Sequence, residues 1–324
     1  MNIKLYPLQF SPILKERIWG GTKLESLLNK PILSEITGES WEISTVKGDV
    51  SIISNGELAG KSLNDLINDD PESILGTEVY KKFGRQFPLL FKYLDAREDL
   101  SIQVHPNDEL AKKRHNSFGK TEMWYVVQAN ENARIIVGFK EKSNAAEYLE
   151  NLKNKTLLSI LDYIEVKQGD VFFLETGTVH AIGAGMIIAE IQQTSDITYR
   201  LYDFDRVDDN GNTRELHVDL ALEAINYNTI ESQKTYSKNL NQSNSVVDCP
   251  YFTTNFMPLE GEVSVAKTGD SFTVYMCVEG NFEIQFEDSK FQYTKGHTVL
   301  IPASMKNFML NGKASILEIY ISNK

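Results

Sequence analysis

Short runs rich in Val, Ile, Phe and Tyr, bounded by Gly, Asn and Asp, dominate this chain and predict a mainly β protein. Four other segments have the i, i+3, i+4 apolar spacing of short amphipathic helices. The clearest strands are Ser40–Ser44, Leu100–His105, Glu122–Val127, Arg134–Phe139, Asp170–Leu174 and Met186–Gln192, and the helices are Leu63–Ile67, Glu72–Phe83, Ala145–Lys153 and His217–Ile225. Strands interrupted by helices predict a β-barrel core with helical insertions.

A polar segment divides the chain. The 324 residues suffice for one large or two medium domains. Residues Thr229–Ser245 are poor in apolar side chains, which indicates a linker or an exposed excursion, and strand signals resume after them. We therefore predict one domain over residues 1–235 and a second over residues 236–324.

A weak internal repeat supports two units. Lys167–Leu174 resembles Thr294–Ile301, and His180 and Asn307 each lie 11 residues after the glycine of their own copy. Upstream, Glu122 aligns with Phe272. One copy thus offers Glu and His where the other offers Phe and Asn, so only the first could hold a metal this way. Chance similarity between two β-hairpins explains the match equally well.

Charge, hydropathy and cysteine content narrow the class of protein. The net charge is −12 without a long Lys/Arg run, which argues against nucleic acid and anionic membranes but allows a small anionic substrate. The N-terminus lacks an apolar signal core, and no stretch approaches the roughly 20 apolar residues of a membrane span. Cys249 and Cys277 form no CxxC pair, so we expect buried free thiols in a soluble, cytoplasmic protein.

Four oxygen and nitrogen donors have the spacing of a metal site. Gln103 and His105 are two residues apart on one predicted strand, so both side chains point to the same face. Glu122 begins the next strong strand, and His180 follows a turn region. Two imidazoles, a carboxylate and an amide suit zinc, iron or manganese. Each residue alone is more often structural, and the four together leave a metal site and ordinary structural roles as the two alternatives.

The residues around these donors resemble the type I phosphomannose isomerases. The similar stretches are Leu100–Pro106, Gly119–Trp124, Thr176–Ala181, Glu190 and Thr198–Asp203, with Trp19–Gly21 and Gly38–Glu42 resembling the short bacterial branch. The resemblance runs from about Leu5 to Val218, and the remainder agrees in layout without a sharp motif.

The resemblance implies a bicupin, which has two jelly-roll-like β-barrels. It implies one Zn²⁺ in the N-terminal barrel, with ligands corresponding to Gln103, His105, Glu122 and His180, and a metal-free second barrel. It also implies a mannose-6-phosphate isomerase, which interconverts D-mannose 6-phosphate and D-fructose 6-phosphate through an enediol or enediolate. We expect a monomer or homodimer that binds this small sugar phosphate.

Two residues match the family's catalytic groups. The resemblance assigns Arg200 to stabilisation of the enediolate. The non-catalytic alternative is a surface ion pair with Asp203 or Asp205. It assigns Glu190 to proton transfer, and because the surrounding run is apolar we expect burial to raise its pKa. Glu190 could instead be an outward strand residue, with metal-bound water or an imidazole as the base.

Three more residues match positions near the substrate phosphate or hydroxyls. Lys92 lies in the apolar run LLFKYL, where a buried lysine needs a partner. Ser101 shares strand parity with Gln103, and Lys120 could equally be an exposed turn lysine. Trp19 could wall the pocket, although a core role is the commoner one. We expect His115, His217 and His297 to be structural or surface residues.

Two other functions fit the donors. Iron-dependent oxygenases also use cupin metal sites, although Lys92, Lys120 and Arg200 favour an anionic sugar over a neutral aromatic substrate. A non-catalytic sugar-binding bicupin would be expected to lack a ligand or the arginine, and this chain lacks neither.

Overall fold

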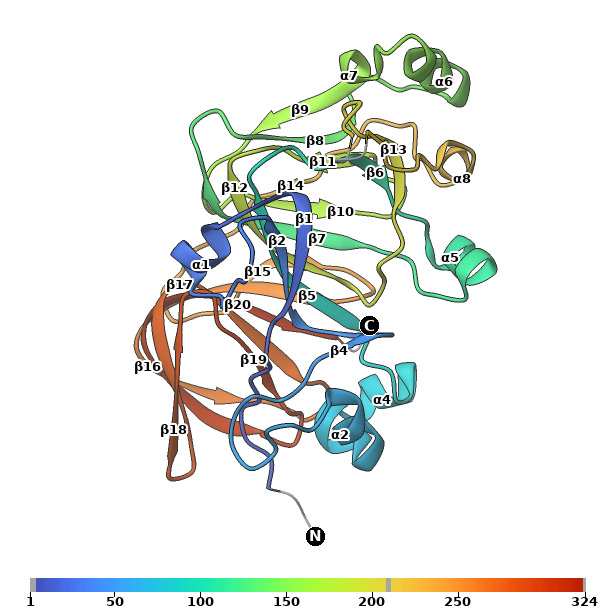
Figure 1. Cartoon of the computed structure of the whole chain (residues 1–324). Helices are drawn as coiled ribbons and strands as arrows, with labels where there is room; N and C mark the ends of the chain where they lie inside the picture. The colour runs from blue at the N-terminus through green and yellow to red at the C-terminus, as the bar shows by residue number, and fades with distance from the viewer. Residues whose placement is uncertain (1–3, 208–210, 323–324) are drawn as a thin grey trace.

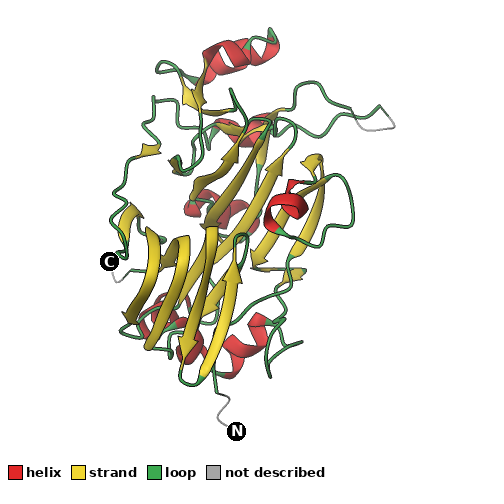
Figure 2. Cartoon of the chain, turned by 90° about the vertical axis from the view of Figure 1, so that its left-hand side faces the viewer, coloured by secondary structure: helices red, strands yellow, loops and turns green. Residues whose placement is uncertain are grey.

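The computed structural model describes residues 4–207 and 211–322, and it is built mainly of β-sheets that stack in two β-rich halves (Figures 1 and 2). A seven-stranded antiparallel sheet lies at the centre of the first half. Its strands, in spatial order, are β1 (Ile13–Gly21), β2 (Thr37–Ile43), β5 (Leu89–Ala96), β12 (Met186–Gln193), β7 (Glu122–Ala129), β10 (Val171–Leu174) and β14 (Gln233–Lys234). A five-stranded sheet faces it, in the order β13 (Tyr199–Tyr202), β6 (Ile102–Val104), β11 (His180–Ile182), β8 (Arg134–Phe139) and β9 (Leu161–Glu165).

The second half is a six-stranded sheet formed by the C-terminal part of the chain. Its strands are β15 (Asn244–Asp248), β16 (Thr253–Ala266), β20 (Asn307–Tyr320), β17 (Thr273–Phe286) and β18 (Ser289–Thr294), with β19 (Thr298–Ile301) also pairing with β17. A small hairpin joins β3 (Thr45–Val46) to β4 (Asp49–Val50). The helices are α1 (Lys23–Leu28), α2 (Leu63–Asp69), α3 (Pro71–Leu75), α4 (Thr77–Phe83), α5 (Asp108–His115), α6 (Ala145–Lys153), α7 (Leu157–Ile160) and α8 (Val218–Leu222).

The predicted elements are largely confirmed, with three corrections. The helix expected over Glu72–Phe83 is two helices, because Gly76 has φ 95° and a side chain there would lie 2.4 Å from the Asp270 backbone. The last predicted helix is shorter than expected, at Val218–Leu222. The polar segment over Thr229–Ser245 is not simply a linker, since it contributes β14 to the first half and begins β15.

The middle strands β5 and β12 of the central sheet are buried on both faces, so their polar side chains also lie in the interior. In β12, Ile187, Ala189 and Ile191 pack in a core shared with the C-terminal sheet. Met186 and Ile188 pack on the opposite face, in the core shared with the five-stranded sheet. Because side chains alternate along a strand, Glu190 faces the five-stranded sheet as well.

The two hairpins of the internal repeat have the same hydrogen bonding. Gly169 N–H donates to Val126 O at 2.9 Å, and Gly296 N–H donates to Cys277 O at 2.8 Å; both glycines have φ near 90°. Strand pairing sets Leu174 opposite Glu122 and Ile301 opposite Thr273. The shared geometry favours a genuine repeat, but Thr273 rather than Phe272 occupies the position of Glu122.

No helix within residues 4–207 and 211–322 combines the length and apolar character needed to cross a bilayer. Cys249 and Cys277 are buried free thiols, as predicted.

Candidate active site

A cavity of about 550 Å³ lies in the first half and brings six of the nine predicted site residues to one surface. These six are Lys92, Ser101, Gln103, Lys120, Glu190 and Arg200. The other three, His105, Glu122 and His180, are buried beside Gln103 and Lys120. Strand parity explains the convergence, because Lys92, Glu122 and Glu190 sit on the face of the central sheet that looks toward the five-stranded sheet.

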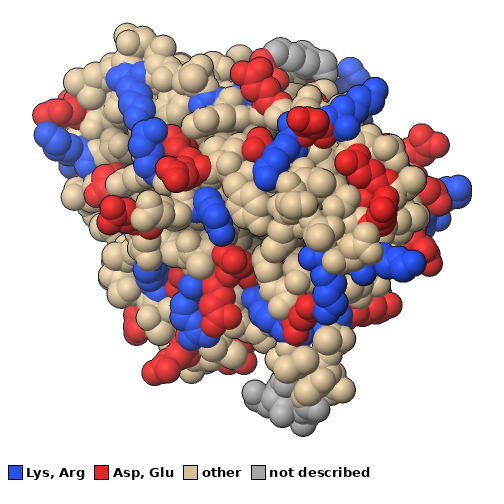
Figure 3. Space-filling view, turned by 90° about the horizontal axis from the view of Figure 1, so that it is seen from above, with Lys and Arg blue, Asp and Glu red and all other residues tan. Residues whose placement is uncertain are grey.

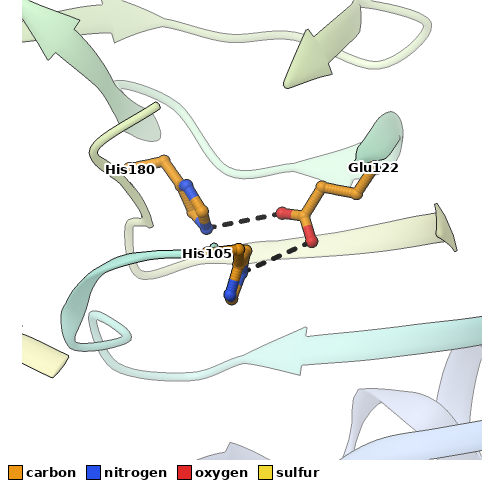
Figure 4. Close-up of side chains that lie close together, drawn as sticks. All are labelled: His105, Glu122 and His180. Carbon is orange, nitrogen blue, oxygen red and sulfur yellow. Dashed lines mark ion pairs between the residues drawn. The ribbon is translucent and has the colours of Figure 1, made fainter. Parts of the chain in front are cut away.

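Three predicted metal ligands converge at the buried side of this cavity (Figure 4). His105 follows β6, Glu122 begins β7 and His180 begins β11. The Nε2 atoms of His105 and His180 lie 3.6 Å and 3.4 Å from the two carboxylate oxygens of Glu122. The candidate ligand atoms all lie within 4.8 Å of one another, which is close enough for one ion to be shared.

The hydrogen bonds of both imidazoles leave their Nε2 lone pairs facing this centre. Nδ1 of His105 donates to Ile197 O, and Nδ1 of His180 donates to Thr178 O, each at 2.8 Å. A carbonyl only accepts, so the proton sits on Nδ1 and Nε2 carries a lone pair. Burial first, and then the charge of Lys120, lowers the pKa of both rings, that of His180 to about 4.

The donor set fits a divalent cation. Glu122 Oε1 is buried without a hydrogen-bond partner, so two lone pairs and one unsatisfied carboxylate oxygen point at a common centre. Electron-rich donors that face one centre repel one another, and a divalent cation there would compensate them more fully than a single ammonium group can. Ring N–H groups held by backbone carbonyls are also the usual outer partners of metal-binding histidines.

Gln103, the fourth predicted ligand, lies beside these donors. It pairs with His180 on the neighbouring strand, and its Nε2 lies 3.2 Å from His180 Nε2. Turning the amide by 180° exchanges its nitrogen for its oxygen at nearly the same place, which presents a carbonyl oxygen to the centre.

Lys120 is part of the site and not an exposed turn residue. It is 4% exposed; its ammonium group pairs with Glu122 and lies 3.1 Å from His105 Nε2. The positive charge of Lys120 therefore lies beside the donor atoms of Glu122 and His105. Burial raises the pKa of Glu122, and the charge of Lys120 opposes this shift only in part.

Lys92 and Glu190 form a buried ion pair on the same face. Lys92 Nζ lies 3.0 Å from Glu190 Oε2, and Trp124 Nε1 donates to Glu190 Oε1 at 3.1 Å. Burial acts to raise the pKa of Glu190, but Lys120, Lys92 and the hydrogen bonds outweigh it and lower the pKa to about 2. The expected raised pKa of Glu190 is therefore wrong, because Lys120 and the strand neighbour Lys92 supply compensating positive charge.

Arg200 faces the cavity without a carboxylate partner among the described residues. Its backbone N–H donates to His217 Nδ1 at 3.0 Å and its Nη1 donates to Glu215 O at 2.9 Å, while Nε is buried and unpartnered. The two carboxylates expected as alternative partners of Arg200 bind other residues. Asp203 accepts from Arg206 and Arg214, and Asp205 pairs with Lys155.

The cavity is also lined by charged residues that sequence reasoning missed. Lys15, Arg17, Asp49 and Arg214 bring the lining to six basic and four acidic side chains. This excess contrasts with the chain's net charge of −12 and with the mixed outer surface seen from above (Figure 3). Alternation along β1 could have revealed Lys15 and Arg17, since they share parity with Trp19, which both lines the cavity and packs in the core.

Two family descriptions match this chain and define its class. Residues 7–144 match the catalytic domain of type I phosphomannose isomerase, and residues 242–321 match the cupin domain of mannose-6-phosphate isomerase. The class is thus a mainly β, cupin-containing isomerase with a buried cluster of metal-binding residue types.

Similarity to individual relatives extends over nearly the whole chain. Mannose-6-phosphate isomerase ManA of Bacillus subtilis is 36% identical over 315 residues, which cover 96% of this chain and 98% of the relative. The mannose-6-phosphate isomerase of Streptococcus mutans is 34% identical over 314 residues, covering 96% and 97%. The crystal structure of mannose 6-phosphate isomerase from Bacillus subtilis matches at a TM-score of 0.89 and 34% identity, covering 97% of this chain and 99% of that one. The chain belongs to the type I mannose-6-phosphate isomerase family and is an enzyme of that family.

Proposed function

We propose that this enzyme interconverts D-mannose 6-phosphate and D-fructose 6-phosphate through an enediol or enediolate, with one Zn²⁺ per chain. The observation that carries the proposal is the convergence of His105, Glu122 and His180, with donor atoms 3.4–3.6 Å apart, beside a cavity with excess positive charge. The names of the relatives support the substrate. The resemblance selects zinc, because the donor types alone suit several divalent ions.

The metal would be held by Gln103, His105, Glu122 and His180. A bound divalent ion would supply Lewis acidity that orients or polarises the substrate's oxygen atoms. The protein's part is to fix the ligands, which the carbonyls of Ile197 and Thr178 do by holding the two rings in one tautomer.

Arg200 is our candidate for stabilising the negative charge that develops when a proton leaves the carbon next to the carbonyl. Among residues 4–207 and 211–322 its guanidinium has no carboxylate partner, and within the same residues its buried Nε–H has no acceptor. An oxyanion placed there gains a charge-assisted hydrogen bond without breaking an existing ion pair.

Glu190 is our candidate for moving the proton between C1 and C2. Its lowered pKa keeps it ionised at neutral pH, so it is ready to accept a proton. Its basicity is low while Lys92 donates to it. A substrate oxygen or phosphate that draws the Lys92 ammonium away would raise that basicity at the moment of binding.

Ser101, Lys92 and Lys120 would bind the phosphate or hydroxyl groups of the substrate, and Arg214 would assist at the phosphate. Lys92 and Lys120 are already paired with buried carboxylates. They would therefore attract the anionic substrate by their positive charge and donate to it only those N–H groups that the carboxylates do not use. Arg214 contacts Asp203 through Nε and Nη2, and its side chain also lines the cavity. A bidentate contact between guanidinium and phosphate is a common mode of phosphate recognition.

We further propose a bicupin divided into residues 1–235, with the catalytic barrel, and residues 236–324, with a metal-free barrel. The repeated hairpins support the second barrel, and Thr273 and Asn307 replace two ligands there. The halves are tightly joined, since Leu8 pairs with Leu300 and Phe272 N–H donates to Leu75 O. We place the enzyme in the cytoplasm as a monomer or homodimer.

The test follows conversion of mannose 6-phosphate to fructose 6-phosphate by the purified protein, before and after chelation and after zinc is restored. We expect activity to disappear with the chelator and to return with zinc. His105→Ala should abolish zinc binding, whereas His297→Ala in the C-terminal half serves as the matched control. Zinc-loaded, folded protein without turnover would overturn the isomerase proposal. Dioxygen consumption with iron would indicate an oxygenase, and sugar binding without turnover a binding protein.

A further inference from the structure

We propose that Asp108 is a positioning residue through which Tyr251 of the C-terminal half holds the segment that carries Lys120 and Glu122. This inference rests on the proposed function of that segment. It gives the C-terminal half a specific part in the reaction beyond its packing against the first half.

The segment itself is clamped at its middle residue. Thr121 lies between Lys120 and Glu122, and its N–H donates to the Gln193 side-chain oxygen at 2.9 Å. Its carbonyl accepts from the Gln193 N–H at 3.1 Å, so both backbone polar groups of Thr121 are fixed by one residue at the end of β12. Rotation of this peptide would move the Lys120 ammonium and the Glu122 carboxylate together.

Asp108 holds the same segment from the other end. Its Oδ1 accepts from the Gly119 N–H at 2.8 Å and from Gln193 Nε2 at 3.0 Å. Gly119 packs directly on the start of α5, where an added Cβ would lie 2.8 Å from Asp108 N. One carboxylate oxygen thus joins Gly119 to the side chain that clamps Thr121.

Tyr251 connects this carboxylate to the second half of the molecule. Its hydroxyl donates to Asp108 Oδ2 at 2.9 Å, across 143 positions of sequence. Tyr251 lies between β15 and β16, and the adjacent Phe252 is fully buried in the core shared by the two halves. Burial, then the hydrogen bond with Asp108 and the charge of that carboxylate, raise the pKa of Tyr251 to about 12, so the phenol remains a donor at neutral pH.

The resulting chain of contacts runs from Tyr251 through Asp108 to Gly119 and Gln193, and from Gln193 to Thr121. Each link is a hydrogen bond of 2.8–3.1 Å. Because geometric errors of about 1 Å at a catalytic group cost up to a hundredfold in rate, loosening this chain should be visible in catalysis.

The experiment compares Tyr251→Phe with Tyr236→Phe. Tyr236 is the matched control, because its hydroxyl also joins the two halves, donating to Gly169 O at 2.6 Å, but it contacts no part of the segment. We expect Tyr251→Phe to lower kcat about 2- to 10-fold, the effect of one lost hydrogen bond, and to weaken zinc binding. We also expect faster amide exchange in the peptide covering residues 116–123, with exchange elsewhere unchanged.

Variants of Asp108 separate positioning from simple folding. Asp108→Asn keeps an oxygen for Gly119 and Gln193 and an amide that can donate to the Tyr251 hydroxyl, so it should retain most of the activity. Asp108→Ala removes all three contacts and should lose more than Tyr251→Phe.

The inference is overturned if Tyr251→Phe matches Tyr236→Phe in kcat, zinc affinity and exchange of residues 116–123. It is equally overturned if exchange accelerates throughout both halves, since Tyr251 would then only support the fold. Failure of the proposed function is distinguishable, because the unaltered zinc-loaded enzyme would then be inactive whereas the exchange measurement would still report on the contacts.

Discussion

Lys92 and Glu190 lie directly opposite each other on β5 and β12, with the Lys92 Nζ 3.0 Å from Glu190 Oε2. Both side chains are less than a tenth exposed, so each charge depends on the other for compensation. Burial alone would raise the pKa of Glu190, and the neighbouring lysines reverse that effect. The protonation state of our candidate for proton transfer is therefore set by Lys120 together with Lys92 on the adjacent strand.

Replacing Lys92 should move the pH dependence of the reaction. Loss of its positive charge removes a cause that lowers the pKa of Glu190, so that pKa rises. The acid limb of kcat/KM for Lys92→Met is expected to shift to higher pH, where protonated Glu190 can no longer accept a proton. The pH profile of both proteins checks this, and an unmoved limb in an active Lys92→Met would transfer the base role to another group.

Arg200 should be needed for the rate of the chemical step more than for binding. Arg200→Lys keeps the charge but loses the fixed fork of donors, and we expect kcat to fall roughly 100-fold, as for removal of an oxyanion donor. Arg206→Lys is the control, because Arg206 pairs with Asp203 and lies outside the cavity lining. Equal losses in both variants would mean that the arginines only support the loop around Asp203.

Arg214 should affect KM instead. We expect Arg214→Ala to raise KM for the sugar phosphate about 10-fold or more, with a smaller change in kcat, because the lost contact is to a group that does not react. Inhibition by inorganic phosphate provides a second measurement, since it should weaken in Arg214→Ala together with the affinity for the sugar phosphate. A normal KM with unchanged phosphate inhibition would remove Arg214 from the phosphate site.

Zinc should stabilise the folded chain through the three convergent donors. An ion that binds only the folded state at about 100 times its Kd adds about 3 kcal/mol, which thermal unfolding detects as a rise of several degrees in Tm. His180→Ala should lose this rise but keep the Tm of the metal-free protein within a few degrees. If the variant still gained the full increase with zinc, the ion would bind elsewhere.

Local sequence pattern predicted the strands well. It therefore also predicted which side chains of each strand point toward the site. Gln103 and His105 were expected on one face from their spacing, and Glu122 and His180 from the strands that begin there; the structure brings all four together. The resemblance added Lys92, Ser101, Lys120, Glu190 and Arg200, which line the same cavity.

What sequence reasoning missed depends on pairing between distant strands. The pKa of Glu190 could not be predicted without knowing that Lys92 lies opposite it, 98 positions away in sequence. The contact of Tyr251 with Asp108 joins the two halves and leaves no periodic signal. The one-residue error at Phe272 has a similar cause, since only the ladder of β17 with β19 shows that Thr273 is the counterpart of Glu122.

Glu318 occupies in the second half the place that Glu190 has in the first. The two residues therefore allow the structural and catalytic contributions of this position to be compared. Glu190 is opposite Trp124 and Glu318 is opposite Tyr275. Each carboxylate accepts from its aromatic neighbour, at 3.1 Å and 3.2 Å, and each pairs with a lysine, which for Glu318 is Lys267 at 2.6 Å. The lining of the large cavity includes Glu190 but not Glu318.

Glu318→Gln should therefore reduce stability and leave kcat unchanged, whereas Glu190→Gln should reduce kcat. Burial opposes ionisation of Glu318, but Lys267 and its hydrogen bonds lower its pKa overall. A carboxyl group with a lowered folded-state pKa stabilises the protein above its unfolded pKa, and this contribution is lost as the pH falls through the folded value. We expect Glu318→Gln to cost about 1–3 kcal/mol of unfolding free energy at pH 7, with the difference shrinking below about pH 4. Denaturant unfolding across this range checks the sign, and a difference that grows in acid would show that Glu318 is not held as a buried carboxylate.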